Sequence, residues 1–245
     1  CASLSVEQIA DKYLIGGLYG KLANICADMN EMDRVQEGLL KAIVSGDSIT
    51  ADRKYKSSIQ FKPTCKLFFA TNVLPRFTDT SLGIWRRMIL IPFNYTVPAD
   101  RKDTKLFTKL QAEMPGIFYW ALQGLVRLRE QNGYTRSPVC EAAARNYRLH
   151  CFPILLFLEE CTSDAEPSYT CTAHQLWTAY RKWCISTGLR KPKPLHQMIR
   201  DVLAFKPRVQ YSRVTPGLEA HRELYGLRVR DEVTFEAVPA VSMYE

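Results

Sequence analysis

Two short apolar runs near the middle of the chain are each bounded by polar residues. Residues 67–70 (Leu-Phe-Phe-Ala) are followed by Asn72 and a proline-closed loop, and residues 88–91 follow two adjacent arginines, Arg86 and Arg87. A short continuous apolar run between turn signals is typical of a buried strand in a parallel sheet. Ligands of such sheets bind at the carboxyl ends of the strands, which is where Asn72 would lie.

This order of strand, amide, loop, arginines and second strand suits nucleotide hydrolysis. An asparagine such as Asn72 can orient a water molecule toward a γ-phosphate. Arg86 or Arg87 can neutralise the charge of the transition state, often in the site of a neighbouring subunit. The simpler alternative is that Asn72 caps a turn and that both arginines are solvated. The combination of these residues favours the nucleotide interpretation.

An acidic residue follows another apolar stretch earlier in the chain. Residues 22–27 read as a short strand, and Asp28 comes directly after it. A carboxylate at the end of a buried strand can organise a magnesium ion and the attacking water. A turn or helix cap is the alternative, and Asn30, Glu31 and Asp33 compete for the same role.

A hairpin with a basic tip is predicted between these two strands. Residues 49–61 alternate like two strands around four consecutive residues, namely Arg53, Lys54, Tyr55 and Lys56. Lysines at such a tip can contact phosphates, and a tyrosine can stack on a base. A solvated hairpin turn explains the same residues equally well.

The remainder of the chain is mainly helical. Helices are expected at residues 104–131 (interrupted at 115–116), 139–161 (broken near 153), 172–186 and 194–204, and strands at 209–214 and 225–229. Several helices followed by a two-stranded wing are the outline of a winged-helix domain, a variant of the helix-turn-helix theme.

Composition places the chain among intracellular globular proteins. Its 245 residues are 47% apolar and 24% charged, and the formal net charge is +8, which favours a polyanionic partner such as nucleic acid. Eight scattered cysteines without a C-x-x-C pair suit a reducing compartment. No apolar run approaches the 18 residues of a membrane span. We therefore expect a cytoplasmic protein with no membrane partner.

Four blocks in this order resemble the superfamily 3 helicase region of phage, plasmid and poxvirus-type primase–helicases. They lie within residues 20–28 (GKL…AD), 40–51 (LKAIVSGDSITA), 61–75 (FKPT…KLFFATNVLP) and 85–93 (WRR…IPF). The resemblance implies an α/β fold. It would contain a partial AAA+-type parallel-sheet core with a DNA-binding hairpin, followed by a mainly α winged-helix domain.

The resemblance also implies roles at the nucleotide. Asp28 matches the acid that organises Mg²⁺ through water, although the family more often has glutamate there. Asn72 matches the polar sensor at the end of the next strand. Arg86 or Arg87 matches the arginine finger, and the sequence does not decide between them.

The DNA-contacting part of the resemblance involves the helix before the hairpin. Lys41 and Asp47 match the helix and turn that lead into it. Lys54 and Lys56 fall at the basic tip, which would contact single-stranded DNA.

One element of the family, the phosphate-binding loop, is missing. That loop needs G-x-x-x-x-G-K-[ST], whose backbone amides cradle the phosphates. Residues 16–22 (GGLYGKL) have glycines one residue too close, and Leu22 carries no hydroxyl. The resemblance places the loop upstream of Cys1. We therefore expect a fragment whose complete form binds ATP and Mg²⁺.

The predicted organisation and function follow from these points. The predicted parts are a partial ATPase core at 1–130, a linker at 131–138, a winged-helix domain at 139–232 and a tail at 233–245. The chain would be the C-terminal part of an ATP-dependent replicative DNA helicase of a phage or mobile element. It would act as a homo-oligomeric ring, a hexamer, on single-stranded DNA, with a primase domain possible in the parent chain. The alternative is a non-enzymatic DNA-binding or oligomerisation module that uses the winged helix.

Overall fold

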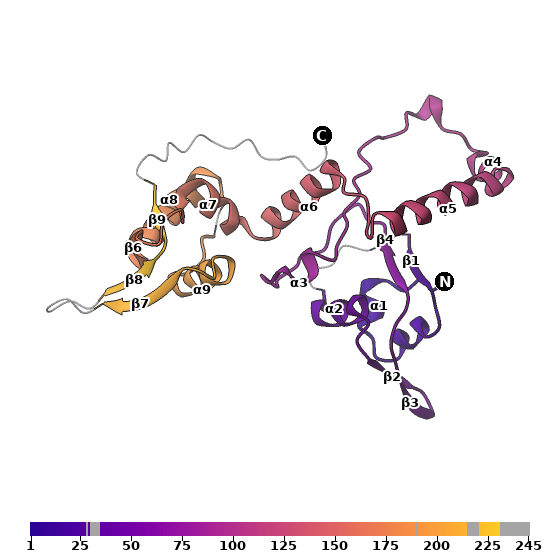
Figure 1. Cartoon of the computed structure of the whole chain (residues 1–245), viewed down its shortest axis with the longest axis horizontal. Helices are drawn as coiled ribbons and strands as arrows, with labels where there is room; N and C mark the ends of the chain where they lie inside the picture. The colour runs from indigo at the N-terminus through magenta and orange to yellow at the C-terminus, as the bar shows by residue number, and fades with distance from the viewer. Residues whose placement is uncertain (28, 30–34, 190, 215–220, 231–245) are drawn as a thin grey trace. The chain divides into compact units, whose positions relative to one another are not determined.

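The computed structural model describes residues 1–27, 29, 35–189, 191–214 and 221–230. Within these ranges the protein is a mixed α/β chain with small sheets of two or three strands (Figure 1). It divides into two compact units. One contains Cys1–Met88 and the described residues from Tyr147 onward, and the other contains Ile89–Asn146.

The first 88 residues form two pairs of strands with short helices between them. In chain order the elements are α1 (Val6–Ala10), η1 (Leu14–Leu18), β1 (Ala23–Cys26), α2 (Glu37–Ser45), β2 (Ile49–Arg53), β3 (Lys56–Phe61), β4 (Lys66–Phe69) and α3 (Leu82–Trp85). Figure 1 shows β1 and β4 side by side, with the β2–β3 hairpin extending away from α1 and α2.

The strand predicted at residues 67–70 is present as β4, and it pairs in parallel with β1. The prediction that it is buried is wrong, because its residues alternate between exposed and half-buried and Phe68 is 56% exposed. Ile25 lies opposite Phe68, and the amide of Ala70 extends the ladder by donating to the carbonyl of Cys26 at 2.9 Å. The fully buried Asn24 fixes β1 to the preceding chain. Its side chain exchanges two hydrogen bonds of 2.8 and 2.9 Å with the backbone of Leu4.

The second predicted strand, at residues 88–91, is wrong. These residues are irregular, and Ile89 and Ile91 are more than half exposed. A strand needs a neighbour to bind its N–H and C=O groups. In the described ranges, β1 and β4 pair only with each other and with an isolated bridge at Ala2. The apolar run therefore has no sheet to join.

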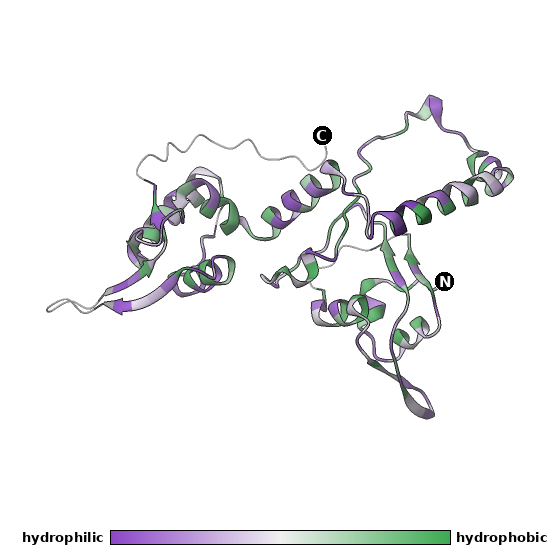
Figure 2. Ribbon diagram, viewed as in Figure 1, coloured by the Kyte–Doolittle hydropathy of each residue, from purple (hydrophilic) through white to green (hydrophobic). Residues whose placement is uncertain are grey.

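The unit from Ile89 to Asn146 is mainly helical. It contains η2 (Ala99–Arg101), α4 (Leu106–Ala112), α5 (Met114–Glu130) and the start of α6 (Pro138–Cys151). The predicted interruption is present, because α4 ends before Glu113 and Pro115 lies in the first turn of α5, where proline is tolerated. The first half of α5 is apolar and aromatic and its charged residues lie near its end (Figure 2), and none of its side chains is buried.

The part after Tyr147 contains helices packed on a small antiparallel sheet. Its elements are the end of α6, then α7 (Pro153–Cys161), β5 (Thr162–Ser163), β6 (Thr170–Thr172), α8 (Ala173–Ser186), α9 (Leu195–Phe205), β7 (Gln210–Val214), β8 (His221–Tyr225) and β9 (Arg228–Val229). Strands β6, β8 and β7 form one sheet in that order, and β5 pairs with β9. Leu158, Leu176, Met198 and Leu224 are at most 2% exposed and form its core.

The predicted helices of this part are all present, whereas its strands differ from the prediction. The strand predicted at residues 225–229 is wrong, because the chain turns at Gly226 with φ +82° and separates β8 from β9. Strands β5 and β6 have two and three residues, too few to show an alternation. In the described segments no helix is long and apolar enough to cross a membrane.

Aromatic side chains connect the two halves of the larger unit. Phe77, Trp85, Tyr147, Phe152 and Phe205 contact one another edge to face in a chain, with ring centroids 5.3 to 6.0 Å apart. The hydroxyl of Tyr147 donates a hydrogen bond to the carbonyl of Pro75. Burial raises the pKa of Tyr147, so the phenol stays protonated and keeps donating.

Candidate functional site

The hairpin tip is the most exposed candidate. Strands β2 and β3 pair from Ile49 opposite Phe61 to Arg53 opposite Lys56, leaving a two-residue loop of Lys54 and Tyr55. All four predicted residues, 53–56, are exposed. In the described part of the chain, no carboxylate forms an ion pair with Lys54 or Lys56. The tip therefore offers positive charge to an outside ligand.

Tyr55 has an unfavourable backbone conformation. Its φ is +61°, in the left-handed region that glycine normally occupies, and its side chain is 102% exposed. A residue other than glycine pays roughly 1–2 kcal/mol in this region. The ring gains no packing in return. Strain of this kind at an exposed position points to a function for the side chain.

The end of β2 next to the tip is fixed to the body of the unit. The carboxylate of Asp52 forms a 3.0 Å ion pair with the ammonium of Lys12, and the backbone amide of Asp52 donates to the carbonyl of Lys12 at 2.8 Å. The carboxylate of Asp52 raises the pKa of Lys12. Across the hairpin, Nε of Arg53 donates to the carbonyl of Ser57 at 3.0 Å. Arg53 is thus partly engaged within the hairpin, whereas Lys54 and Lys56 are exposed without a close ion pair to a described carboxylate, and the charge of Lys54 only helps to lower the pKa of Asp11.

Asn72 lies just past the carboxyl end of β4, as predicted. It is exposed, and the turn around it is held by Thr71, whose hydroxyl donates to the carbonyl of Val73 at 2.6 Å. β4 is a parallel strand, and the carboxyl ends of such strands are where ligands bind. Asp28, the predicted magnesium-organising acid, lies outside the described residues, as do Asn30, Glu31 and Asp33.

The two arginines have different surroundings. Arg87 donates to the carbonyl of Gly83 at 2.6 Å and to the hydroxyl of Ser45 at 2.8 Å. Arg86 is exposed, and its guanidinium has no hydrogen bond or ion pair to any described residue. The structure therefore separates two adjacent residues that the sequence could not distinguish.

Lys41 and Asp47 lie where the hairpin begins, although neither points to its tip. Lys41, on α2, pairs with Asp79, and Asp47 lies in the turn between α2 and β2. The amide of Asp47 donates to the carbonyl of Ala42 at 2.9 Å, which closes the end of α2 beyond Gly46. Both residues thus shape the helix and turn before the hairpin.

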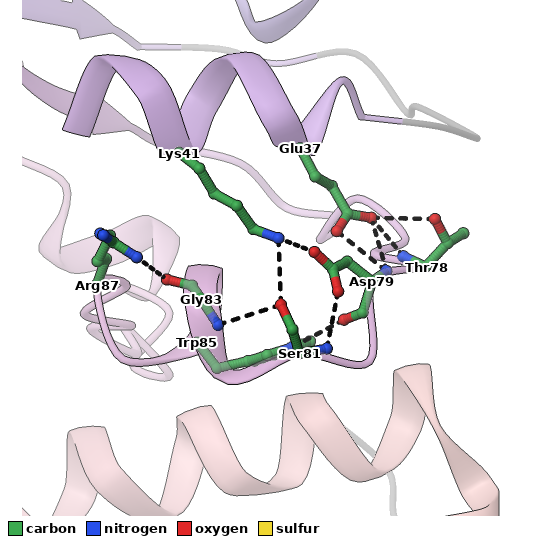
Figure 3. Close-up of polar contacts among 8 residues, drawn as sticks. All are labelled: Glu37, Lys41, Thr78, Asp79, Ser81, Gly83, Trp85 and Arg87. Carbon is green, nitrogen blue, oxygen red and sulfur yellow. Dashed lines mark hydrogen bonds and ion pairs between the residues drawn. The ribbon is translucent and has the colours of Figure 1, made fainter. Parts of the chain in front are cut away.

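Glu37 belongs to the same region and was not singled out from the sequence. It is 8% exposed and accepts from the amides of Thr78 and Asp79 at 2.5 and 3.0 Å (Figure 3). A glutamate in the first turn of a helix is so common that nothing in the sequence marked it. Its partners are 41 and 42 residues away.

The glycine-rich segment near residue 20 uses backbone amides within its own turns. Residues 14–18 form η1, and the amides of Tyr19 and Lys21 donate to the carbonyls of Gly16 and Leu18 at 3.1 Å. A phosphate loop needs such amides to be available for the ligand. This agrees with the missing glycine spacing and hydroxyl.

The part after Tyr147 exposes several basic side chains. On α9, His196 and Arg200 are exposed, while Met198 and Ile199 face the core. On the β7–β8 hairpin, Arg213 and Arg222 are exposed, and Arg222 also lies over a tyrosine ring at 5.7 Å. Both elements thus present positive charge.

Comparisons with known proteins point to helicases of large DNA viruses. A family described as a family of unknown function (DUF5906) matches residues 2–87. The chain is 25% identical to "Putative helicase 022R" of Frog virus 3 (isolate Goorha) in an alignment of 193 positions that covers 69% of this chain and 19% of that protein. It is 37% identical to "Putative helicase L207/L206" of Acanthamoeba polyphaga mimivirus over 90 residues, which are 36% of this chain and 9% of that protein. The chain thus spans less than a fifth of either relative.

Proposed function

We propose that this chain is one region of a longer ATP-dependent DNA helicase of the superfamily 3 type. This helicase would act in the replication of a DNA virus or mobile element. Similarity to two proteins named as helicases supports the class. The small share of their length that the chain covers supports a longer protein. The observation that carries the proposal is the exposed tip at residues 53–56, with its unpaired lysines and strained tyrosine.

In this proposal the hairpin tip binds single-stranded DNA. Lys54 and Lys56 contact phosphates, and the ring of Tyr55 stacks on a base, which is worth roughly 1–3 kcal/mol per base. Such contacts do not depend on the base identity, as expected for a protein that moves along a strand. ATP hydrolysis would shift the tip relative to the bound strand.

The nucleotide would be bound between neighbouring copies in a ring. Asn72, past the end of β4, would orient the attacking water, and Asp28 would organise Mg²⁺ through water. Arg86 would reach the γ-phosphate of the neighbouring copy, because it is exposed while Arg87 is bound within its own subunit. Since the described residues contain no phosphate cradle, we assign that loop to another part of the longer protein.

A salt titration tests the DNA contact. Lys54→Ala should weaken binding of a fluorescent oligo(dT) in anisotropy measurements and reduce the slope of log K against log salt by about 0.7. Lys62→Ala is the matched control. Lys62 is exposed too, but it lies about 20 Å from Lys56 along the extended chain. An unchanged slope for Lys54→Ala, or an equal loss for both variants, would reject the tip as the binding site.

A second candidate is a DNA-binding module in residues 139–230. It rests on the sheet order β6–β8–β7 with three helices, which is compatible with a winged helix, and on the exposed cations of α9 and the β7–β8 hairpin. Arg200→Ala should then weaken binding to duplex DNA, whereas Lys182→Ala, which removes an exposed cation from α8, should not. Equal binding by both variants would exclude α9 as the contact helix.

A further inference from the structure

Three polar side chains of α2 share one stripe of the helix. Glu37, Lys41 and Ser45 are spaced four residues apart, which places them on one face, one above the other. All three contact a single segment, residues 78–87, and they meet it in chain order (Figure 3). We call Glu37, Lys41 and Ser45 the polar stripe.

Glu37 holds the start of the segment through its backbone. Its carboxylate accepts from the amide and the hydroxyl of Thr78, at 2.5 and 3.1 Å, and from the amide of Asp79, at 3.0 Å. The carboxylate is nearly buried, and hydrogen bonds to a charged acceptor are stronger than neutral ones. If the turn at residues 78–79 moved away from α2, the Glu37 carboxylate would either become exposed to solvent or stay buried without its hydrogen bonds.

Lys41 holds the middle of the segment. Its ammonium pairs with Asp79 and lies 3.3 Å from the hydroxyl of Ser81. That hydroxyl in turn caps α3 by accepting from the amide of Gly83 at 3.4 Å. A Cβ on Gly83 would lie 3.1 Å from Cε of Lys41, so the glycine lets the lysine approach. The start of α3 is thus fixed by the same lysine.

Ser45 holds the end of the segment through Arg87. The guanidinium bridges the hydroxyl of Ser45 and the carbonyl of Gly83, at 2.8 and 2.6 Å. Arg86, the adjacent residue, is therefore presented from a backbone that is fixed on one side by α3 and on the other by Arg87. Its own side chain remains exposed.

The same helix leads directly into the hairpin. Only residues 46–48 separate α2 from β2. Gly46 ends the helix with φ +74°, and Leu40 and Ile43 anchor another face of α2 in the core. One rigid helix thus connects the arginine-bearing turn to the strand that ends at the DNA-contacting tip.

We propose that Glu37 and Lys41 are positioning residues. They would make the β2–β3 hairpin and residues 78–87, the segment that carries Arg86 and Arg87, move as one body. The inference rests on the proposed function and deepens it, because it names the residues that transmit DNA binding to the nucleotide of the neighbouring copy. When the tip shifts on DNA, α2 carries residues 78–87 with it, and Arg86 changes its position at that nucleotide. Neither positioning residue touches ATP or DNA itself.

Lys41→Met tests the proposal in the full-length protein that carries these residues. Methionine keeps the aliphatic part of the side chain and removes the ion pair. We expect the kcat for ATP hydrolysis with oligo(dT) present to fall about tenfold, since small misplacements of a catalytic group are costly. The KM for ATP and the Kd for oligo(dT) should both stay within about twofold, because no binding contact is removed. A purely structural role would instead lower kcat and raise both the KM for ATP and the Kd for oligo(dT).

Three further variants make the result specific. The exchange Lys41→Asp with Asp79→Lys restores an ion pair and should recover most of the lost kcat. Lys109→Met removes a comparable pair, with Asp103 at 2.7 Å in the other unit, and should leave hydrolysis unchanged. If Lys41→Met lowers the unfolding temperature strongly, Ser45→Ala, which removes one hydrogen bond only, provides the same comparison with a smaller loss.

The possible failures are distinguishable. If oligo(dT) stimulates the unmodified protein and Lys41→Met equally, the positioning role is overturned while the helicase proposal survives. The same conclusion follows if the exchanged pair fails to restore kcat in a folded protein. If the unmodified protein hydrolyses no ATP and Lys54→Ala binds oligo(dT) normally, the proposed function fails, and the positioning role fails with it.

Discussion

Replacing Tyr55 with glycine should separate stability from DNA binding. Glycine adopts φ near +61° without strain, which should raise the free energy of unfolding by roughly 1–2 kcal/mol. The greater conformational freedom of glycine in the unfolded chain should lower it by about 0.4–1 kcal/mol. Because the Tyr55 ring is fully exposed, no packing is lost. The net effect on unfolding should lie between zero and about 1.5 kcal/mol of stabilisation. Losing one stacked base, worth about 1–3 kcal/mol, should meanwhile weaken oligo(dT) binding roughly 5- to 150-fold.

Urea unfolding and fluorescence anisotropy measure the two effects on the same preparation. Tyr55→Phe keeps both the ring and the strain, so its stability and affinity should match those of the unmodified protein. Tyr55→Ala keeps the strain and loses the ring, so its affinity should fall without a gain in stability. If Tyr55→Gly binds oligo(dT) as tightly as the unmodified protein, the stacking argument is refuted, and the left-handed conformation has no functional explanation.

Two further predictions concern stability. Arg87→Ala should lower the free energy of unfolding by about 1–2 kcal/mol, since it removes two hydrogen bonds of a charged group, whereas Arg86→Ala should change it by less than about 0.5 kcal/mol. Urea titrations decide this, and equal losses would contradict the assignment of Arg86 as the exposed arginine. Burial raises the pKa of Cys161 to about 12 and that of Cys171 to about 11, from an ordinary 9.0. The folded state then keeps protons that the unfolded chain releases, so this stability is complete below pH 9. It falls from about pH 9 to about pH 11 for Cys171 and to about pH 12 for Cys161. Thermal unfolding across that range checks the sign, and Cys171→Ser should flatten the profile.

Local patterns identified the elements that carry their own signals. β4 is a continuous apolar run that ends in a turn, and the hairpin has alternating positions around a polar tip, so both were predictable. The position of Asn72 after β4 followed from the same run. The helices after residue 138 were predictable as well, because their apolar positions recur at helical spacing.

Features that depend on distant partners were not predictable. The run at residues 88–91 looks like a strand, but strand formation depends on a neighbour that no local pattern reveals. The distinction between Arg86 and Arg87 depends on Ser45, which lies 42 residues earlier. The backbone strain at Tyr55 likewise cannot be inferred from its amino-acid type, because it is the two-residue loop that forces this residue into the left-handed region.

The four-residue spacing of Glu37, Lys41 and Ser45 constrains the number of residues in α2. One inserted residue would still leave a good helix, yet it would rotate everything beyond the insertion by about 100°. An insertion between Glu37 and Lys41 would therefore turn Ser45 away from Arg87 and aim β2 in a new direction. Among divergent homologues, side chains of α2 can change freely on its solvent-facing side. Insertions and deletions, by contrast, should be confined to the loops outside it.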